Sequence, residues 1–500
     1  MSEFVVSATK DYEIGRISNL LFGSFIEHMG SVIYSGIYEP DHKLADENGF
    51  RQDVLELVED LELGCLRYPG GNYTSAYNWE DTIGPKVDRK VKLDIAWQGI
   101  EPNEFGLHEF IEYANRLNTD VIFTLNLGTR GIEEAVNIVE YCNFDSGTYW
   151  SDLRKKNGAE EPFNIKIWCL GNEMDGQWQI GSKTAEEYGR LANETSKAIK
   201  RIDSEIKTIL VGSSTPRLST YPEWDRVVLE ESYDNIDYLS LHNYLDKYNE
   251  SDLTRSPEKE TYDTEEFLAK SIQFEKHIEE VIATCDYVKA NKRSDKTIYL
   301  AFDEWNVHSQ PYKDNQKFKI GSPIDWTYFT MEDSLLFGSM GLALLRNCDR
   351  VKIGCQSLLV NTIPLILTDK DGKSWVNPTY FVFKDLSKYS IGTVLDSKLK
   401  SDNKENENII EKKMVDAVVV NNKDSIVVYV INKTKNDHML NFDLDFNSNK
   451  ITHFEMISDS IKDINHRDKP DKIKPITKVY NDKKTISLKK YSWNTFILNK

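Results

Sequence analysis

One hydrophobic pattern recurs along the first three-quarters of the chain. A short apolar run, rich in β-branched and aromatic residues, ends in polar residues or glycine, and an amphipathic stretch of helical periodicity follows it. Eight such runs occupy residues 20–27, 63–71, 120–128, 165–173, 206–214, 236–244, 297–305 and 350–357. The helix candidates between them include residues 51–61, 107–117, 132–142 and 184–202.

Strands that alternate with helices pair in parallel, and strands that are apolar along their length are buried on both faces. Eight units of this kind predict an α/β fold, a closed (β/α)8 TIM barrel. The alternative is a doubly wound open sheet. We favour the barrel because polar residues recur at the carboxyl ends of the runs, where a barrel builds its site. No GxGxxG or Walker motif opens any of the helices.

The hydrophobic pattern changes after about residue 380. Short alternating segments separated by turn signals predict a C-terminal all-β sandwich, jelly-roll-like, with strands in residues 416–434, 438–446, 452–458, 484–490 and 493–499. Two charged segments, 400–412 and 462–474, are expected to be surface loops. The predicted domains are an N-terminal strand region that joins the sandwich (1–17), the barrel (18–380) and the C-terminal sandwich (381–500).

Composition narrows the class of protein. A net charge of -19 argues against nucleic acid or an anionic membrane as partner. The N-terminus has no basic region followed by an apolar segment, and no apolar run approaches ~18 residues, so we expect neither a secretory signal nor a membrane span. The 6 cysteines lie far apart with no CxxC spacing, which is typical of reduced core thiols in a cytoplasmic protein.

Two carboxylates stand at strand ends that lie across the mouth of the predicted barrel. Glu173 ends the fourth run, in the sequence GNE, and Glu304 ends the seventh, in FDEWN. A single glutamate at such a position is better explained as a helix cap or a surface ion-pair partner. A pair, flanked by Trp, Asn or Gly, indicates glycoside hydrolysis, and a separation near ~5 Å would imply retention of configuration.

The chain resembles the intracellular α-L-arabinofuranosidases of glycoside hydrolase family 51. The resemblance covers roughly residues 15 to 380 and continues more weakly into the sandwich. It is carried by FGSFIEHMG (22–30), RYPGGNY (67–73), AWQGIEPNEFG (96–106), NLGTRG (126–131), WCLGNEMDGQWQIG (168–181), SLHNY (240–244) and FDEWNV (302–307).

This resemblance implies a retaining, exo-acting enzyme that removes terminal non-reducing α-L-arabinofuranosyl residues from arabino-oligosaccharides, arabinan or arabinoxylan fragments by double displacement. It implies Glu304 as the nucleophile and Glu173 as the general acid/base. We hypothesise that the pKa of Glu173 is the higher of the two, because the acid must be protonated while the nucleophile is ionised.

The resemblance also implies a set of sugar-binding or supporting residues. Arg67 is expected to pair with Glu304, Tyr244 to hydrogen-bond it, His242 to orient its neighbours and Asn172 to bond the sugar 2-hydroxyl. The full predicted set of substrate-binding residues is Glu27, Arg67, Asn72, Trp97, Asn172, His242, Tyr244 and Gln356. No cofactor and no metal are expected, and the family implies a homohexamer.

Two positions depart from what is common in that family. Asn243 stands where a Gln is common, and His308 where many members carry a Trp. The second departure leaves the preference for the leaving group open, as the sequence also leaves the linkage preference among 1,2, 1,3 and 1,5.

Two other functions are compatible with parts of this pattern. A related barrel hydrolase acting on β-glucan or β-xylan would also place glutamates after strands four and seven, but the combination of Glu27, Arg67 and Gln356 favours the furanosidase. A non-catalytic carbohydrate-binding protein is disfavoured by the intact pair of glutamates.

Overall fold

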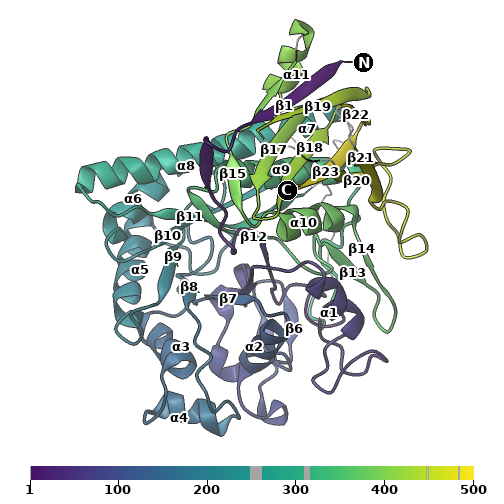
Figure 1. Cartoon of the computed structure of the whole chain (residues 1–500). Helices are drawn as coiled ribbons and strands as arrows, with labels where there is room; N and C mark the ends of the chain where they lie inside the picture. The colour runs from purple at the N-terminus through teal and green to yellow at the C-terminus, as the bar shows by residue number, and fades with distance from the viewer. Residues whose placement is uncertain are drawn as a thin grey trace.

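The computed structural model describes residues 2–500 except 248–261, 309–315, 402, 446–447, 449 and 482–484. Eight strands form a closed barrel in the order β10-β11-β12-β3-β4-β7-β8-β9, and every neighbouring pair is parallel. The prediction of a closed barrel rather than an open sheet is therefore confirmed. The barrel fills the lower part of Figure 1, with the sandwich above it.

Each of the eight apolar runs overlaps one barrel strand. The strands are β3 (Gly23–Phe25), β4 (Cys65–Tyr68), β7 (Asp120–Thr124), β8 (Ile167–Cys169), β9 (Lys207–Leu210), β10 (Tyr238–Leu245), β11 (Tyr299–Val307) and β12 (Val351–Gln356). Two small two-stranded sheets accompany the barrel, formed by β5 (Lys92–Asp94) with β6 (Gly99–Glu101) and by β13 (Ile366–Thr368) with β14 (Ser374–Val376).

All four predicted helices are present. In α5, for example, the Thr184 side chain caps the helix by accepting from the backbone N–H of Glu187, and Tyr188, Ala192 and Ile199 face the core at helical spacing. The helices are α1 (Gln52–Glu59), α2 (Leu107–Arg116), α3 (Ile132–Asn143), α4 (Tyr149–Lys156), α5 (Ala185–Ile199), α6 (Glu223–Ser232), α7 (Thr264–Ala269), α8 (Ser271–Lys292), α9 (Met331–Arg346), α10 (Pro378–Tyr389) and α11 (Glu407–Glu411). No helix in the described part of the chain is long and apolar enough to cross a membrane.

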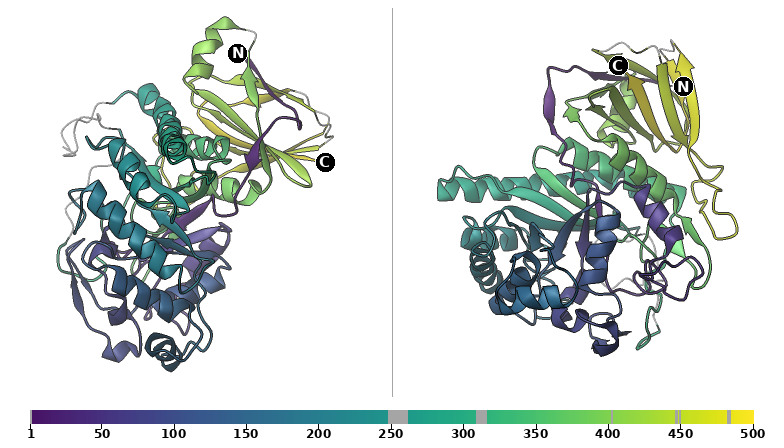
Figure 2. Two further views of the ribbon diagram at one scale, coloured as in Figure 1. Left: turned by 90° about the vertical axis from the view of Figure 1, so that its left-hand side faces the viewer. Right: turned by 60° about the horizontal axis from the view of Figure 1, so that its bottom comes forward.

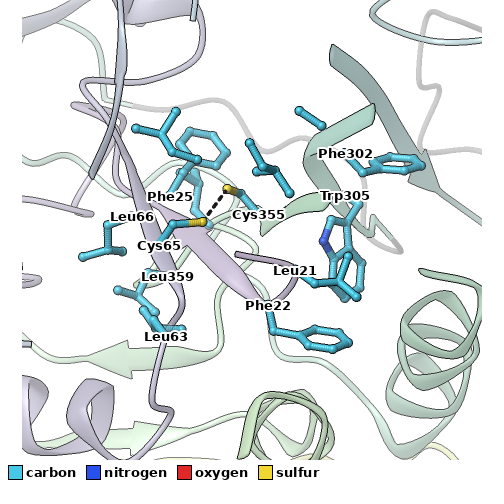
Figure 3. Packing of buried hydrophobic residues seen from close by; sticks show 14 of the residues in the cluster. Leu21, Phe22, Phe25, Leu63, Cys65, Leu66, Phe302, Trp305, Cys355 and Leu359 are labelled. Atoms are coloured by element: carbon cyan, nitrogen blue, oxygen red, sulfur yellow. Dashed lines mark hydrogen bonds between the residues drawn. The ribbon is translucent and has the colours of Figure 1, made fainter. Parts of the chain in front are cut away.

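The barrel interior is tightly packed where β3 runs between β4 and β12. The Cys65 and Cys355 sulfur atoms meet at 3.8 Å among Leu21, Phe25 and other apolar side chains (Figure 3). All six cysteines are free and buried. A Cβ atom on Gly23 would lie 2.3 Å from the Cys65 sulfur, so only glycine allows this approach.

Two facing sheets build the C-terminal part of the chain. One has the order β2-β15-β17-β18-β23-β20-β21 and the other β16-β1-β19-β22. Apolar side chains from both sheets, such as Phe4, Val419, Leu440 and Phe496, share one core. The strands are β1 (Glu3–Ala8), β2 (Glu13–Arg16), β15 (Thr393–Leu395), β16 (Lys398–Lys400), β17 (Val415–Asn421), β18 (Ser425–Asn432), β19 (His438–Leu444), β20 (Lys450–Met456), β21 (Ile476–Asn481), β22 (Thr485–Leu488) and β23 (Ser492–Asn499).

The ends of the chain meet in this second unit. The N-terminal strand β1 lies parallel to β19 and antiparallel to β16. The segment 400–412 is not wholly a loop, because the short helix α11 lies within it. Residues 402, 446 and 484, which belong to predicted segments, lie outside the described residues.

The barrel and the sandwich meet across α9 and α10, where both views of Figure 2 show the sheets resting on helices. The buried Asp385 of α10 accepts hydrogen bonds from the Trp493 ring nitrogen at 2.9 Å and from the Thr495 hydroxyl at 2.6 Å. Trp493 also packs against Gly338 of α9. The predicted domain boundary at residue 380 falls inside α10 and stays a prediction.

Replacing Gly23 by alanine is expected to destabilise the fold. The added methyl group would overlap the Cys65 side chain and its carbonyl oxygen, at 2.3 and 2.6 Å. Overpacking of this kind costs about 1–3 kcal/mol. Thermal unfolding of Gly23→Ala should show a lowered midpoint, whereas Gly131→Ala, whose Cβ meets nothing within 4 Å, serves as the matched control. Equal midpoints for the two variants would contradict the packing argument.

Candidate active site

A cavity of about 750 Å³ opens at the carboxyl ends of the barrel strands. Six of the ten predicted site residues line it, and four do not. The lining residues are Glu27, Asn72, Trp97, Glu173, Tyr244 and Glu304, and the four that are buried but not part of the lining are Arg67, Asn172, His242 and Gln356.

Glu173 sits on a tight turn directly after β8. Gly171 and Glu173 both have left-handed backbone angles, with φ of 105° and 43°. Such a conformation costs a non-glycine residue roughly 1 kcal/mol or more, so the turn is held by its surroundings. The Glu173 carboxylate lies 3.0 Å from His242 Nδ1 and accepts a hydrogen bond from the Trp178 ring nitrogen. The turn thereby directs the carboxylate into the cavity.

Glu304 lies near the end of β11 and is almost fully buried. Its Oε1 accepts from Arg67 Nη1 at 2.7 Å, and its Oε2 accepts from the Tyr244 hydroxyl at 2.8 Å. His242 Nδ1 is 3.6 Å from Oε2. The predicted pairing of Arg67 and Tyr244 with this carboxylate is thus present as contacts, which fix its orientation.

Arg67 is the buried cation beneath the cavity. Its Nη2 donates to the Asn172 side-chain oxygen at 2.7 Å, and its Nε lies 3.3 Å from Asp303. Burial alone would lower the pKa of Arg67, but the charges of Asp303 and Glu304 outweigh it and raise the pKa well above its usual value. Asn172 therefore contacts the guanidinium rather than the cavity.

His242 lies between the two glutamates and Asp303. Its Nδ1 faces Glu173 and Glu304, and its Nε2 is 3.4 Å from Asp303. Burial would lower the pKa of His242, but these three carboxylates outweigh it and raise the pKa well above the usual range. The ring is thus placed to hold a proton between the two glutamates.

Glu27 is a buried acid on the other side of the cavity. Desolvation raises its pKa to about 8, even though its Oε1 accepts from the Tyr73 backbone and the Trp97 ring nitrogen, both at 2.9 Å. Gly70 and Gly71 pack directly against the carboxyl group, since a Cβ on either would lie 3.0 Å from its carbon, Cδ. At neutral pH Glu27 is therefore a protonated acid that can donate as well as accept.

Within the described residues, one group of His, Cys or acidic side chains brings its ligand atoms within 4.8 Å of one another, and it consists of Glu173, His242 and Glu304. Arg67 already contacts Glu304 with a full positive charge. The arrangement is suited to proton transfer, and we assign no metal to it.

Comparison with known proteins agrees with this geometry. Residues 57–266 match the profile "Alpha-L-arabinofuranosidase 1 domain", and residues 303–492 match "Alpha-L-arabinofuranosidase C-terminal domain". An "Intracellular exo-alpha-(1->5)-L-arabinofuranosidase" of Acetivibrio thermocellus is 43% identical over 87% of this chain and 86% of its own. A protein of the same name from Halalkalibacterium halodurans is 41% identical over 98% of both chains.

Among solved structures, a family 51 α-L-arabinofuranosidase from Bifidobacterium longum superposes with a TM-score of 0.90 at 31% identity, covering 100% of both chains. The chain belongs to the α-L-arabinofuranosidases of glycoside hydrolase family 51.

This family 51 member departs from the residues common in the family at His308 and Asn243. One of the two lines the cavity and the other does not. His308 lines the cavity, with its Nε2 3.3 Å from Asp325. Asn243 lies outside that lining, and its side chain is 3.3 Å from His277 Nδ1. Only the first departure bears directly on what the cavity holds.

Gln356 is the predicted sugar ligand with the least support in this family 51 site. It is fully buried, its Oε1 accepts from the Ser24 hydroxyl at 3.0 Å, and its Nε2 donates to the Leu358 carbonyl at 3.0 Å. It does not line the cavity, so direct sugar contact stays a prediction.

Sequence reasoning missed three residues that complete the site. Trp178 donates to Glu173, the Ser357 hydroxyl is 2.6 Å from that of Tyr244, and Asp303 contacts both Arg67 and His242. Trp178 lies five positions after Glu173 within the motif of residues 168–181, and that proximity could have indicated it as a site residue. Nothing in the sequence distinguished Ser357.

Replacing Glu27 by glutamine should change how stability depends on pH. The folded chain keeps a proton on Glu27 that the unfolded chain, with the usual value of 4.5, has released, so stability falls as pH rises from about 4.5 to 8. Gln mimics the protonated acid and lacks this loss. We expect Glu27→Gln to gain stability over wild type, on the order of a few kcal/mol, between pH 5 and pH 8.

The measurement is chemical denaturation of both proteins at the two pH values. Glu47→Gln, at an exposed position, is the control and should follow wild type. A Glu27→Gln curve parallel to wild type at both pH values would show that Glu27 is ionised when folded.

Proposed function

We propose that the chain is a retaining, exo-acting α-L-arabinofuranosidase with Glu304 as nucleophile and Glu173 as general acid/base. The observation that carries the proposal is the separation of the two carboxylates, whose facing oxygens lie within 4.8 Å of each other. Retaining glycosidases hold this pair about 5–5.5 Å apart, whereas inverting enzymes need roughly 6.5–9.5 Å to admit a water molecule.

The reaction proceeds by double displacement. Glu304 attacks the anomeric carbon, the glycosidic C–O bond breaks, and Glu173 gives its proton to the departing oxygen. In the second step Glu173 takes a proton from water, the water oxygen attacks the anomeric carbon, and the ester bond to Glu304 breaks. Arg67 and Tyr244 contact the nucleophile throughout, which holds it on the line of attack.

The sugar would bind through groups that already face the cavity. Glu27, protonated at neutral pH, offers both a donor and an acceptor for sugar hydroxyls, and Asn72 adds an uncharged amide. Trp97 forms a wall of the same pocket. The four predicted residues that do not line the cavity would support the site by holding these groups in place; they are Arg67, Asn172, His242 and Gln356.

The substrate class follows from the cavity and from the relatives. A volume of about 750 Å³ exceeds what one pentose fills, so the leaving sugar has room beside Trp178, Arg217 and His308. The relatives named above are described as acting on α-(1->5) linkages and as intracellular. We propose arabino-oligosaccharides as substrates and a cytoplasmic location, with assembly as a homohexamer.

Initial rates on aryl glycosides test the activity. An aryl α-L-arabinofuranoside should be hydrolysed far faster than the β-D-xylopyranoside or β-D-glucopyranoside, because the site is built around one furanosyl ring. Glu304→Ala should lose activity by roughly 1,000-fold or more, since no covalent intermediate can form. A preference for either pyranoside would instead indicate a β-glycan hydrolase on the same barrel.

The role of Glu173 is tested by the leaving group. Removing a general acid costs roughly 100- to 10,000-fold, and most for leaving groups that need a proton. Glu173→Ala should therefore lose more activity on α-(1->5)-linked arabinobiose than on a dinitrophenyl arabinofuranoside, and added azide should restore turnover of the latter. Equal losses on both substrates would exclude Glu173 as the acid.

A further inference from the structure

Asp303 precedes the proposed nucleophile in sequence but does not line the cavity. Its side chain is 1% exposed. Its Oδ1 accepts from the Ser240 hydroxyl at 2.5 Å and lies 3.4 Å from His242 Nε2. Its Oδ2 lies 3.3 Å from Arg67 Nε and 3.5 Å from the Cys169 sulfur. One carboxylate thus touches both basic side chains of the site.

Each of these two basic side chains also contacts a carboxylate of the proposed catalytic pair. Arg67 donates to Glu304 at 2.7 Å. His242 Nδ1 is 3.0 Å from Glu173 and 3.6 Å from Glu304. Asp303 is therefore one step removed from both glutamates, on two separate paths.

An ionised carboxylate can only accept hydrogen bonds, so the His242 nitrogen that faces it must carry the hydrogen. Burial opposes the ionisation of Asp303, but Arg67 and His242 outweigh it and lower its pKa to about 2. With Nε2 protonated, Nδ1 shares one proton with Glu173, either accepting it from the acid or donating it to the carboxylate. That is the proton that glycoside cleavage requires.

We propose that Asp303 is a positioning residue of the reaction: through His242 it keeps the hydrogen on Nε2, so that Nδ1 shares a proton with Glu173, and through Arg67 it balances the charge beside Glu304. The inference rests on the proposed function of the two glutamates. It concerns where the proton is held, which the pair alone does not determine.

The other groups around this network add no charge. Burial raises the pKa values of Cys169, Tyr188 and Cys355, which keeps them neutral, and lowers that of His277 to about 3. The charges that face Asp303 and His242 are therefore those of Arg67, Glu173, Glu304 and each other.

Removing the buried negative charge of Asp303 should change how the reaction depends on pH. Without it, the proton that His242 shares with Glu173 is released at lower pH. Asp303 lies 3.4 Å from His242 Nε2, and a unit charge at that distance acts with an energy equivalent to at least about one pH unit. Asp303→Asn, which keeps the shape, should therefore move the basic limb of the kcat/KM profile to lower pH by about one unit.

The experiment compares pH profiles of wild type, Asp303→Asn and Ser240→Ala on an aryl α-L-arabinofuranoside. Ser240→Ala removes a hydrogen bond to Asp303 but leaves its charge, so its limbs should coincide with those of wild type. A slower Asp303→Asn enzyme with an unmoved basic limb would overturn the proposal, because packing alone would then explain the loss.

A second measurement uses the wild-type protein and needs no turnover. Nitrogen-15 NMR of histidine-labelled enzyme, with the His242 signal identified by its loss in His242→Asn, should show a hydrogen on Nε2 throughout pH 5 to 8. A bare Nε2 would refute the inference even if Asp303→Asn fails to fold. Absence of arabinofuranosidase activity in the wild type would instead refute the proposed function. The NMR measurement would still show which ring nitrogen of His242 carries the hydrogen.

Discussion

The burial of one guanidinium is the constraint on which the site depends. Arg67 lies beneath the cavity, and leaving such a charge unpaired in the interior would cost several kcal/mol. Its partners come from different parts of the barrel: Asp303 and Glu304 from β11, and Asn172 from the turn after β8. Satisfying this one side chain therefore ties β4, β8 and β11 together at their carboxyl ends. The same contacts orient the carboxylate that we propose as nucleophile.

Charge balance explains why so many acids can share the site. Arg67 places its positive charge between Asp303 and Glu304, and His242 shares a proton with Glu173, so that each of these acids has a basic neighbour. Glu27 adds no charge at neutral pH, since desolvation keeps it protonated. Most of the negative charge of these buried acids is thereby offset, which suits an uncharged sugar, although the chain as a whole carries -19. A phosphorylated ligand would find no free cation in this described network.

The barrel could be predicted because its signals are local. Each apolar run gave one strand, and the polar residue that ends a run reaches the shared mouth wherever strands are parallel, as Glu173 and Glu304 do. Asp303 could not be predicted this way, because successive residues of a regular strand point to opposite faces. The register of β11 shifts against both β10 and β12 near this point, which lets consecutive carboxylates both find buried partners. Gln356 shows the converse: it ends a strand as the pattern requires, yet its amide is bonded to Ser24 and to a backbone carbonyl.

The two glutamates of the proposed catalytic pair are both buried but have different neighbours, and this difference fits their proposed work. Glu304 accepts hydrogen bonds from Arg67, which is buried, and from Tyr244. Glu173 instead accepts from Trp178, whose ring is 45% exposed and stands at the same cavity with Arg217 and His308. The acid/base proposed at Glu173 must reach both the departing oxygen and the incoming water, whereas the proposed nucleophile bonds only to the anomeric carbon. Specificity for the leaving group is therefore expected to depend on Trp178, Arg217 and His308, and specificity for the arabinosyl ring on the groups around Glu27.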